Sequence, residues 1–211
     1  MRLLIIAPRS NLDTQSEILD AIEETSETNI LHGVVTVRAA IETIKTWKPE
    51  AIHFAGHGDD ARLAFEDGNL DAALLADAIR YTGTVRLCLF NSCESVNVAL
   101  ACYMAGASYA IGWQDEVKDR AAVAFGFAFW ASWKMNRDIA GAFRTGREAV
   151  IWGFPGAQAP ALLNGRGEAF REQMAEMKAH VDRMTRLVYW LSGLLAGTML
   201  FILLDVLWLH W

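Results

Sequence analysis

The chain has 211 residues, a formal net charge of −6 and no cluster of lysine or arginine, which argues against a nucleic-acid-binding protein. Its three cysteines are an odd number without a CxxC spacing, so neither a disulfide framework nor a zinc site is predicted. No signal peptide is expected, because only five apolar residues separate Met1-Arg2 from Pro8-Arg9. These features predict a domain in the reducing cytoplasm, with no metal and no cofactor.

Short apolar segments alternate with amphipathic ones along residues 1–152, which is typical of β-strands joined by helices. Strands are predicted at residues 3–7, 29–35, 51–57, 85–90 and 108–112. Helices are predicted at residues 14–24, 37–47, 71–81, 94–104, 118–135 and 138–152, with a small hairpin at 62–68. Right-handed crossovers between such strands predict an α/β fold in which helices sandwich a mostly parallel sheet.

Two of the predicted strands lead to residues that can carry out chemistry. The strand at 51–57 ends in His57, which Gly58 follows, and the strand at 85–90 leads to Cys93. In open α/β sheets, active sites lie at the carboxyl ends of strands. A thiolate attacks carbonyl groups, an imidazole can take the thiol proton, and a helix that starts at Cys93 would favour the anion. We therefore predict that His57 and Cys93 meet at one edge of the sheet, with the amides of Gly58 and Cys93 as oxyanion donors.

Three sequence blocks, HFAGHG, NSCES and GWQDEVKDRAAVAFGFAFW, resemble the CHAT branch of the caspase-like (clan CD) cysteine peptidases over about residues 1–151. The resemblance implies a caspase–haemoglobinase α/β sandwich, a protein or peptide substrate, His57 as general base or acid and Cys93 as nucleophile. The caspase signature Gln-Ala-Cys-x-Gly is absent around Cys93, so aspartate specificity is not carried over.

Acidic residues near the two strand ends suggest how a substrate side chain could be selected. Asp115 and Asp119 follow the strand at 108–112, in a loop that helps to shape the S1 pocket of related peptidases, and Asp59 follows His57. A carboxylate in this pocket would favour arginine or lysine at P1. Asp119 could instead be a helix N-terminal charge without substrate contact. Three other residues fit core packing better than a site: His53, Cys88 and Cys102.

The C-terminal part of the chain has the composition of a membrane anchor. Residues 187–204 carry no charge, and aromatic residues lie near both ends of the stretch 187–209, as in a transmembrane helix. Arg183 and Arg186 precede this stretch and no lysine or arginine follows it, which predicts a single-pass protein with a cytoplasmic N-terminal domain. A buried helix that packs on a partner is the alternative interpretation.

Two further features of this region indicate self-association. Gly193 and Gly197 form a GxxxG spacing, which lets two helices approach closely in lipid. The upstream stretch has apolar residues at coiled-coil spacing over less than three heptads. The expected organisation is a caspase-like domain at 1–152, a linker at 153–165, an amphipathic juxtamembrane helix at 166–186 and a transmembrane helix at 187–209.

The combined interpretation is a membrane-anchored cysteine endopeptidase that a separate sensor protein or oligomerisation switches on. The family resemblance, rather than the residue pattern, suggests an effector in bacterial defence or regulated cell death. Two alternatives stay open. In one, the membrane helix forms pores and the caspase-like body assembles them. In the other, the protein is a catalytically silent adaptor that binds a partner through the same body.

Overall fold

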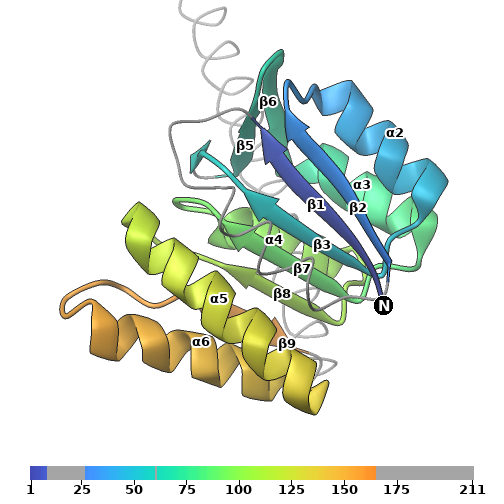
Figure 1. The fold of residues 1–211 in the computed structure, drawn as a ribbon. Coiled ribbons are helices and arrows are strands. Elements are labelled where there is room, and N and C mark those ends of the chain that lie inside the picture. The colour runs from blue at the N-terminus through green and yellow to red at the C-terminus, as the bar shows by residue number, and fades with distance from the viewer. Residues whose placement is uncertain (9–26, 60, 165–211) are drawn as a thin grey trace, which may run out of the picture. The chain divides into compact units, whose positions relative to one another are not determined.

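A six-stranded sheet in the order β2-β1-β3-β7-β8-β9 runs through the described part of the chain (Figure 1). Its strands are β1 (Arg2–Pro8), β2 (Glu27–Gly33), β3 (Ala51–Ala55), β7 (Leu87–Asn91), β8 (Tyr109–Gly112) and β9 (Ala161–Asn164). Neighbouring strands are parallel, except that β9 is antiparallel to β8. The computed structural model describes residues 1–8, 27–59 and 61–164, which all belong to the unit Met1–Gly165. The predicted α/β fold with a mostly parallel sheet is thus confirmed.

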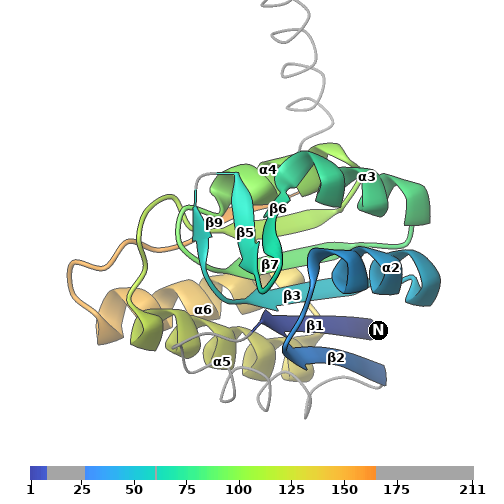
Figure 2. The same ribbon diagram turned by 90° about the horizontal axis from the view of Figure 1, so that it is seen from above.

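Helices cover both faces of this sheet (Figure 2). They are α2 (Val37–Trp47), α3 (Ala72–Thr82), α4 (Val96–Met104), α5 (Asp119–Asn136) and α6 (Ile139–Gly153). Apolar residues of α2, α3 and α4 form one buried cluster with the sheet, and those of α5 and α6 form a second. Successive residues of β1 alternate between the two clusters, which explains its unbroken apolar sequence. The helix predicted at 14–24 lies outside the described residues.

A small antiparallel sheet follows β3 and precedes α3. It consists of β4 (Gly58–Asp59), β5 (Arg62–Phe65) and β6 (Gly68–Asp71). The hairpin of β5 and β6 confirms the turn predicted from Glu-Asp-Gly, and Leu63 and Leu70 anchor it in the main core. Because β4 starts directly after His57, this sheet fixes the backbone on the carboxyl side of the histidine.

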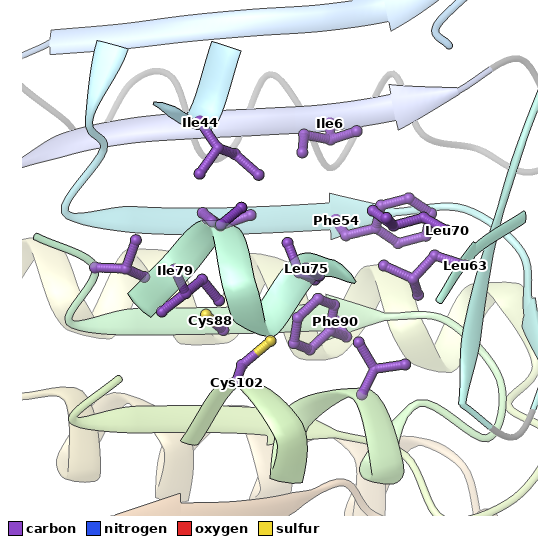
Figure 3. Packing of buried hydrophobic residues seen from close by; sticks show 14 of the residues in the cluster. Ile6, Ile44, Phe54, Leu63, Leu70, Leu75, Ile79, Cys88, Phe90 and Cys102 are labelled. Carbon is purple, nitrogen blue, oxygen red and sulfur yellow. The ribbon is translucent and has the colours of Figure 1, made fainter. Parts of the chain in front are cut away.

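The residues predicted to be structural rather than functional are core residues. Cys88 and Cys102 are completely buried and lie next to each other among aliphatic side chains (Figure 3). Burial, together with the neighbouring Cys88 thiol, raises the pKa of the Cys102 thiol well above its ordinary value, so it stays protonated and unreactive. His53 is also buried, and its Nδ1 accepts a hydrogen bond of 3.3 Å from Trp130 Nε1.

The segment predicted as a linker is in part an edge strand. Residues 161–164 of the predicted linker 153–165 form β9, which pairs with β8 from Gly112↔Ala161 to Tyr109↔Asn164. The hydroxyl of Tyr103 donates to the Asn164 carbonyl at 3.1 Å, which ties the strand to α4. Pro155 and Pro160, which indicated a linker, fall on the loop before β9, whereas Gly153 is the last residue of α6. Four residues are too short for a clear strand period.

The predicted membrane anchor is not part of the described fold. Both the juxtamembrane stretch 166–186 and the span 187–209, with Gly193 and Gly197, lie outside the described residues. Within the described ranges, no helix combines the length and the apolar character needed to cross a membrane.

The position of α5 against the sheet predicts very different effects for two phenylalanines on this helix. Phe125→Ala should lower the free energy of unfolding by about 3–5 kcal/mol, because Phe125 is fully buried and contacts the rings of Trp113, Phe129 and Phe143. Phe127, two residues further along, is 59% exposed. Its replacement by alanine should change the free energy by less than about 1 kcal/mol. Urea denaturation measures both, and equal losses would contradict this placement of α5.

Candidate active site

The strands β3 and β7 bring two turns together at one edge of the sheet. Their last paired residues are Ala55 and Asn91, so His57 and Cys93 each lie two residues beyond the same register position. The N–H of Gly56 donates to the Asn91 carbonyl at 3.5 Å and extends the pairing past the strand end. The pairing therefore places the His57 turn beside the Cys93 turn, as the sequence predicts. The imidazole of His57 is exposed and the side chain of Cys93 is half-buried.

Gly58 allows the two turns to touch. A Cβ atom at Gly58 would lie 3.0 Å from both the Cys93 carbonyl oxygen and Ser92 Oγ, so a larger residue does not fit without movement. Gly58 pairs with Leu63, while the Ala64 N–H donates to the carbonyl of the preceding histidine at 3.0 Å. This pattern makes Gly58 and Leu63 a non-hydrogen-bonded pair. The Gly58 N–H therefore points away from β5 and takes no part in the β4–β5 ladder.

Buried hydrogen bonds hold the turn after β7 in place. The side chain of Asn91 donates to the Ala122 carbonyl at 2.7 Å and accepts from Trp113 Nε1 at 3.0 Å. The hydroxyl of Ser95 donates to the Ser92 carbonyl at 2.7 Å and accepts from the Trp113 N–H at 3.1 Å. Asn91 and Ser95 are both almost completely buried. That Asn91 and Ser95 hold this turn was not predicted from the sequence, although two polar residues around a buried strand end were a signal for such a role.

Helix α4 begins later than predicted, which corrects the expected environment of Cys93. The prediction started this helix at Glu94, but it starts at Val96, three residues beyond the cysteine. Glu94 has a φ of 48°, in the left-handed region, which is incompatible with a continuous α-helix. The Glu94 N–H donates to the Asp115 carbonyl at 3.2 Å instead. Cys93 thus lies in a turn, and the predicted support from a helix that starts at this residue does not hold.

The sulfur of Cys93 contacts the backbone of Val117. The Val117 N–H points at Sγ with a nitrogen–sulfur distance of 3.4 Å, and the thiol can donate to the Val117 carbonyl at 3.8 Å. The two contacts together fix the position of the sulfur at the strand edge.

Comparison with known proteins assigns the chain to a family. The family model described as the CHAT domain matches residues 6–195. The chain belongs to the CHAT-domain family. This family is caspase-like and related to cysteine peptidases, and many of its members are inactive. The match continues past residue 152, where the sequence predicts the end of the domain, and includes β9. A search of curated proteins finds no significant match.

A pocket of about 600 Å³ adjoins the Cys93 turn of this CHAT domain. It is lined by Glu94, by residues 115–118, and by residues 153–158, which comprise the end of α6 and the loop that leads toward β9. Three carboxylates line the pocket, from Glu94, Asp115 and Glu116, against the single ammonium group of Lys118. Of the predicted substrate-binding residues, only Asp115 lines it.

The other two predicted acidic residues lie elsewhere in the CHAT domain. Asp119 is the first residue of α5, the position expected from its alternative interpretation as a helix N-terminal charge. Asp59 lies in β4 and makes two hydrogen bonds to Arg62, at 3.0 and 3.1 Å. Sequence reasoning missed Glu116 and the loop 153–158, because nothing in their local pattern shows that they meet across a pocket.

Proposed function

We propose that this CHAT domain is a cysteine endopeptidase with Cys93 as nucleophile and His57 as general base and acid. The observation that carries the proposal is the pairing of Ala55 with Asn91, which sets the two residues at equivalent positions of adjacent strand ends. Thiol and imidazole are the pair that acyl transfer from a peptide requires. The half-buried sulfur and the exposed imidazole leave this edge of the sheet accessible to an extended substrate.

The reaction follows from these two groups. His57 removes the proton of Cys93 as Sγ attacks the carbonyl carbon of the peptide bond. The tetrahedral intermediate collapses, the C–N bond breaks, and His57 gives the proton to the leaving amine. A water molecule then attacks the thioester, with His57 as base, and the acid product leaves as Sγ regains its proton. The negative charge on the substrate oxygen needs donors, which the N–H groups of Gly58 and Cys93 would supply.

Replacing the nucleophile is the direct test of this function. Cys93→Ala should reduce cleavage of susceptible peptides by at least about a thousandfold, and His57→Ala should have a comparable effect, because the two groups act as a unit. Cys102→Ala is the matched control, since this thiol is buried in the core and should leave cleavage intact. A peptide library read by mass spectrometry gives the rates. Cleavage that survives Cys93→Ala contradicts the assignment.

We further propose that the pocket beside Cys93 receives the P1 side chain and favours arginine or lysine. Asp115 is the residue predicted from sequence for this role, and Glu94 and Glu116 add carboxylates to the same pocket. A charge-assisted hydrogen bond contributes about 1.5–3 kcal/mol. A bidentate contact to arginine would therefore give peptides with a basic P1 residue a clearly higher kcat/KM than peptides with a neutral one.

Neutralising the pocket tests the preference for a basic P1 residue. The double variant Asp115→Asn, Glu116→Gln should lower kcat/KM for an arginine P1 peptide by roughly 10–100-fold, with little change for the glutamine analogue. Asp77→Asn, which removes an exposed carboxylate on α3, is the control and should change neither. An equal loss on both peptides would mean that the pocket does not select charge.

We also propose that residues 187–209 anchor the CHAT domain to a membrane, single-pass, with the domain in the cytoplasm. The uncharged stretch, its aromatic ends and the preceding arginines support this. Gly193 and Gly197 support self-association in the membrane. We propose that a separate sensor protein, or this self-association, activates the peptidase. The active protein would then be an effector in bacterial defence or regulated cell death.

Truncation after Arg186 separates the peptidase from the rival functions. The truncated protein should leave the membrane fraction and still cleave a soluble peptide, because both proposed catalytic residues lie in the unit Met1–Gly165. A pore-forming effector would instead lose its toxicity while Cys93→Ala in the full chain kept it. A silent adaptor would show neither cleavage nor labelling of Cys93 by a thiol-reactive peptide probe.

A further inference from the structure

Ser92, which precedes the proposed nucleophile, is a buried polar residue whose side chain has no hydrogen-bond partner among the described residues. It is 2% exposed, and its hydroxyl makes no hydrogen bond to any residue that the structure describes. Ser95 is an internal comparison, because it lies in the same turn and is 1% exposed. Its hydroxyl bonds to Phe90, Ser92 and Trp113 backbone groups. Two serines of equal burial in one turn therefore differ completely in their hydrogen bonding.

The hydroxyl of Ser92 faces the other proposed catalytic turn. Its Oγ is 3.0 Å from the position that a Cβ of Gly58 would occupy. The carbonyl of Ser92 accepts from Ser95 Oγ at 2.7 Å, so its backbone is fixed while the hydroxyl can still rotate. The Gly58 N–H takes no part in the β4–β5 ladder, as its pairing with Leu63 shows. The hydroxyl thus lies at the contact between the turn that carries His57 and the turn that carries Cys93.

We propose that Ser92 is a positioning residue for the His57–Cys93 pair, an inference that rests on the proposed peptidase function. A buried hydroxyl without a partner destabilises the resting fold, and such groups are rare in native proteins. Features that lower stability in this way collect at functional sites. When substrate binds, the Ser92 hydroxyl rotates to donate to a backbone carbonyl of the adjacent turn around Gly58, which holds His57 near the sulfur and leaves the Gly58 N–H free for the oxyanion. Ser92 does not touch the substrate, because it is buried.

The first readout of the test is thermal stability. Ser92→Ala removes a hydroxyl that has no partner within residues 1–8, 27–59 and 61–164, so the melting temperature should stay the same or rise. Ser95→Ala is the matched control. It leaves the Trp113 N–H without its acceptor and should lower the melting temperature. A fall for Ser92→Ala as large as that for Ser95→Ala would show a hydroxyl bonded in the resting fold, which would overturn the proposal.

The second readout is the reactivity of Cys93, which needs no knowledge of the substrate. The alkylation rate of Cys93 by iodoacetamide is followed against pH by mass spectrometry in the full chain. Cys88 and Cys102 are completely buried and do not interfere. His57→Ala should slow alkylation at neutral pH and move the rate profile to higher pH. Ser92→Ala should cause a smaller change of the same kind, about threefold to tenfold at pH 7, because the imidazole is held less closely.

The outcomes of this pair of variants are distinguishable. A slower reaction in both variants, with Ser92→Ala as stable as wild type or more so, supports the positioning role. A wild-type profile in Ser92→Ala beside a slowed His57→Ala overturns the role of Ser92 and leaves the proposed peptidase intact. A wild-type profile in both variants overturns the thiol–imidazole pair itself, and with it the role of Ser92.

Discussion

The parallel pairing of β3 with β7 is the constraint on which the proposed site depends. It runs from Ala51↔Leu87 to Ala55↔Asn91, and both strands are buried on both faces. Because each strand contributes alternate residues to two apolar layers, a shift by one residue would exchange those layers. The hydrophobic core therefore fixes the register, and the register fixes which residues stand opposite each other two positions beyond the strand ends. In this way, the packing of the core determines that the turns with His57 and Cys93 lie side by side.

The same core also supplies the groups that hold the nucleophile turn. Helix α5 is buried along its apolar face, yet its Ala122 carbonyl accepts the side chain of Asn91. The end of β8 approaches the turn so closely that a Cβ at Gly112 would lie 2.7 Å from the Ser95 carbonyl oxygen. The turn is thus clamped between α5 and β8, and the neighbouring loop 115–118 places one wall of the pocket. Residues 91–95 therefore both carry the proposed nucleophile and pack against the core.

The sequence predicted the elements with strong periodicity or clear end signals. The helix at 37–47 matches α2 from first to last residue, because Thr36 caps its N-terminus and Lys48 ends it in the left-handed region. The strands that lead to His57 and Cys93 were also predicted, although β3 ends at Ala55, two residues before the predicted end, and β7 starts at Leu87 rather than Val85. The edge strand β9 was missed because it is short, and the start of α4 was misplaced because tertiary hydrogen bonds hold Glu94 outside the helix. The far wall of the pocket could not be predicted, since only folding brings residues 153–158 near Cys93.

The most direct test of the account is a crystal structure of the protein with a peptide aldehyde that carries arginine at P1. A thiol adds reversibly to such an aldehyde, and the resulting oxygen occupies the place of the oxyanion. The account predicts a bond from Cys93 Sγ to the aldehyde carbon, the oxygen within hydrogen-bond distance of the Gly58 N–H, and the arginine in the pocket beside Glu94 and Glu116. An unmodified Cys93, or an imidazole of His57 turned away from the bound sulfur, would contradict it.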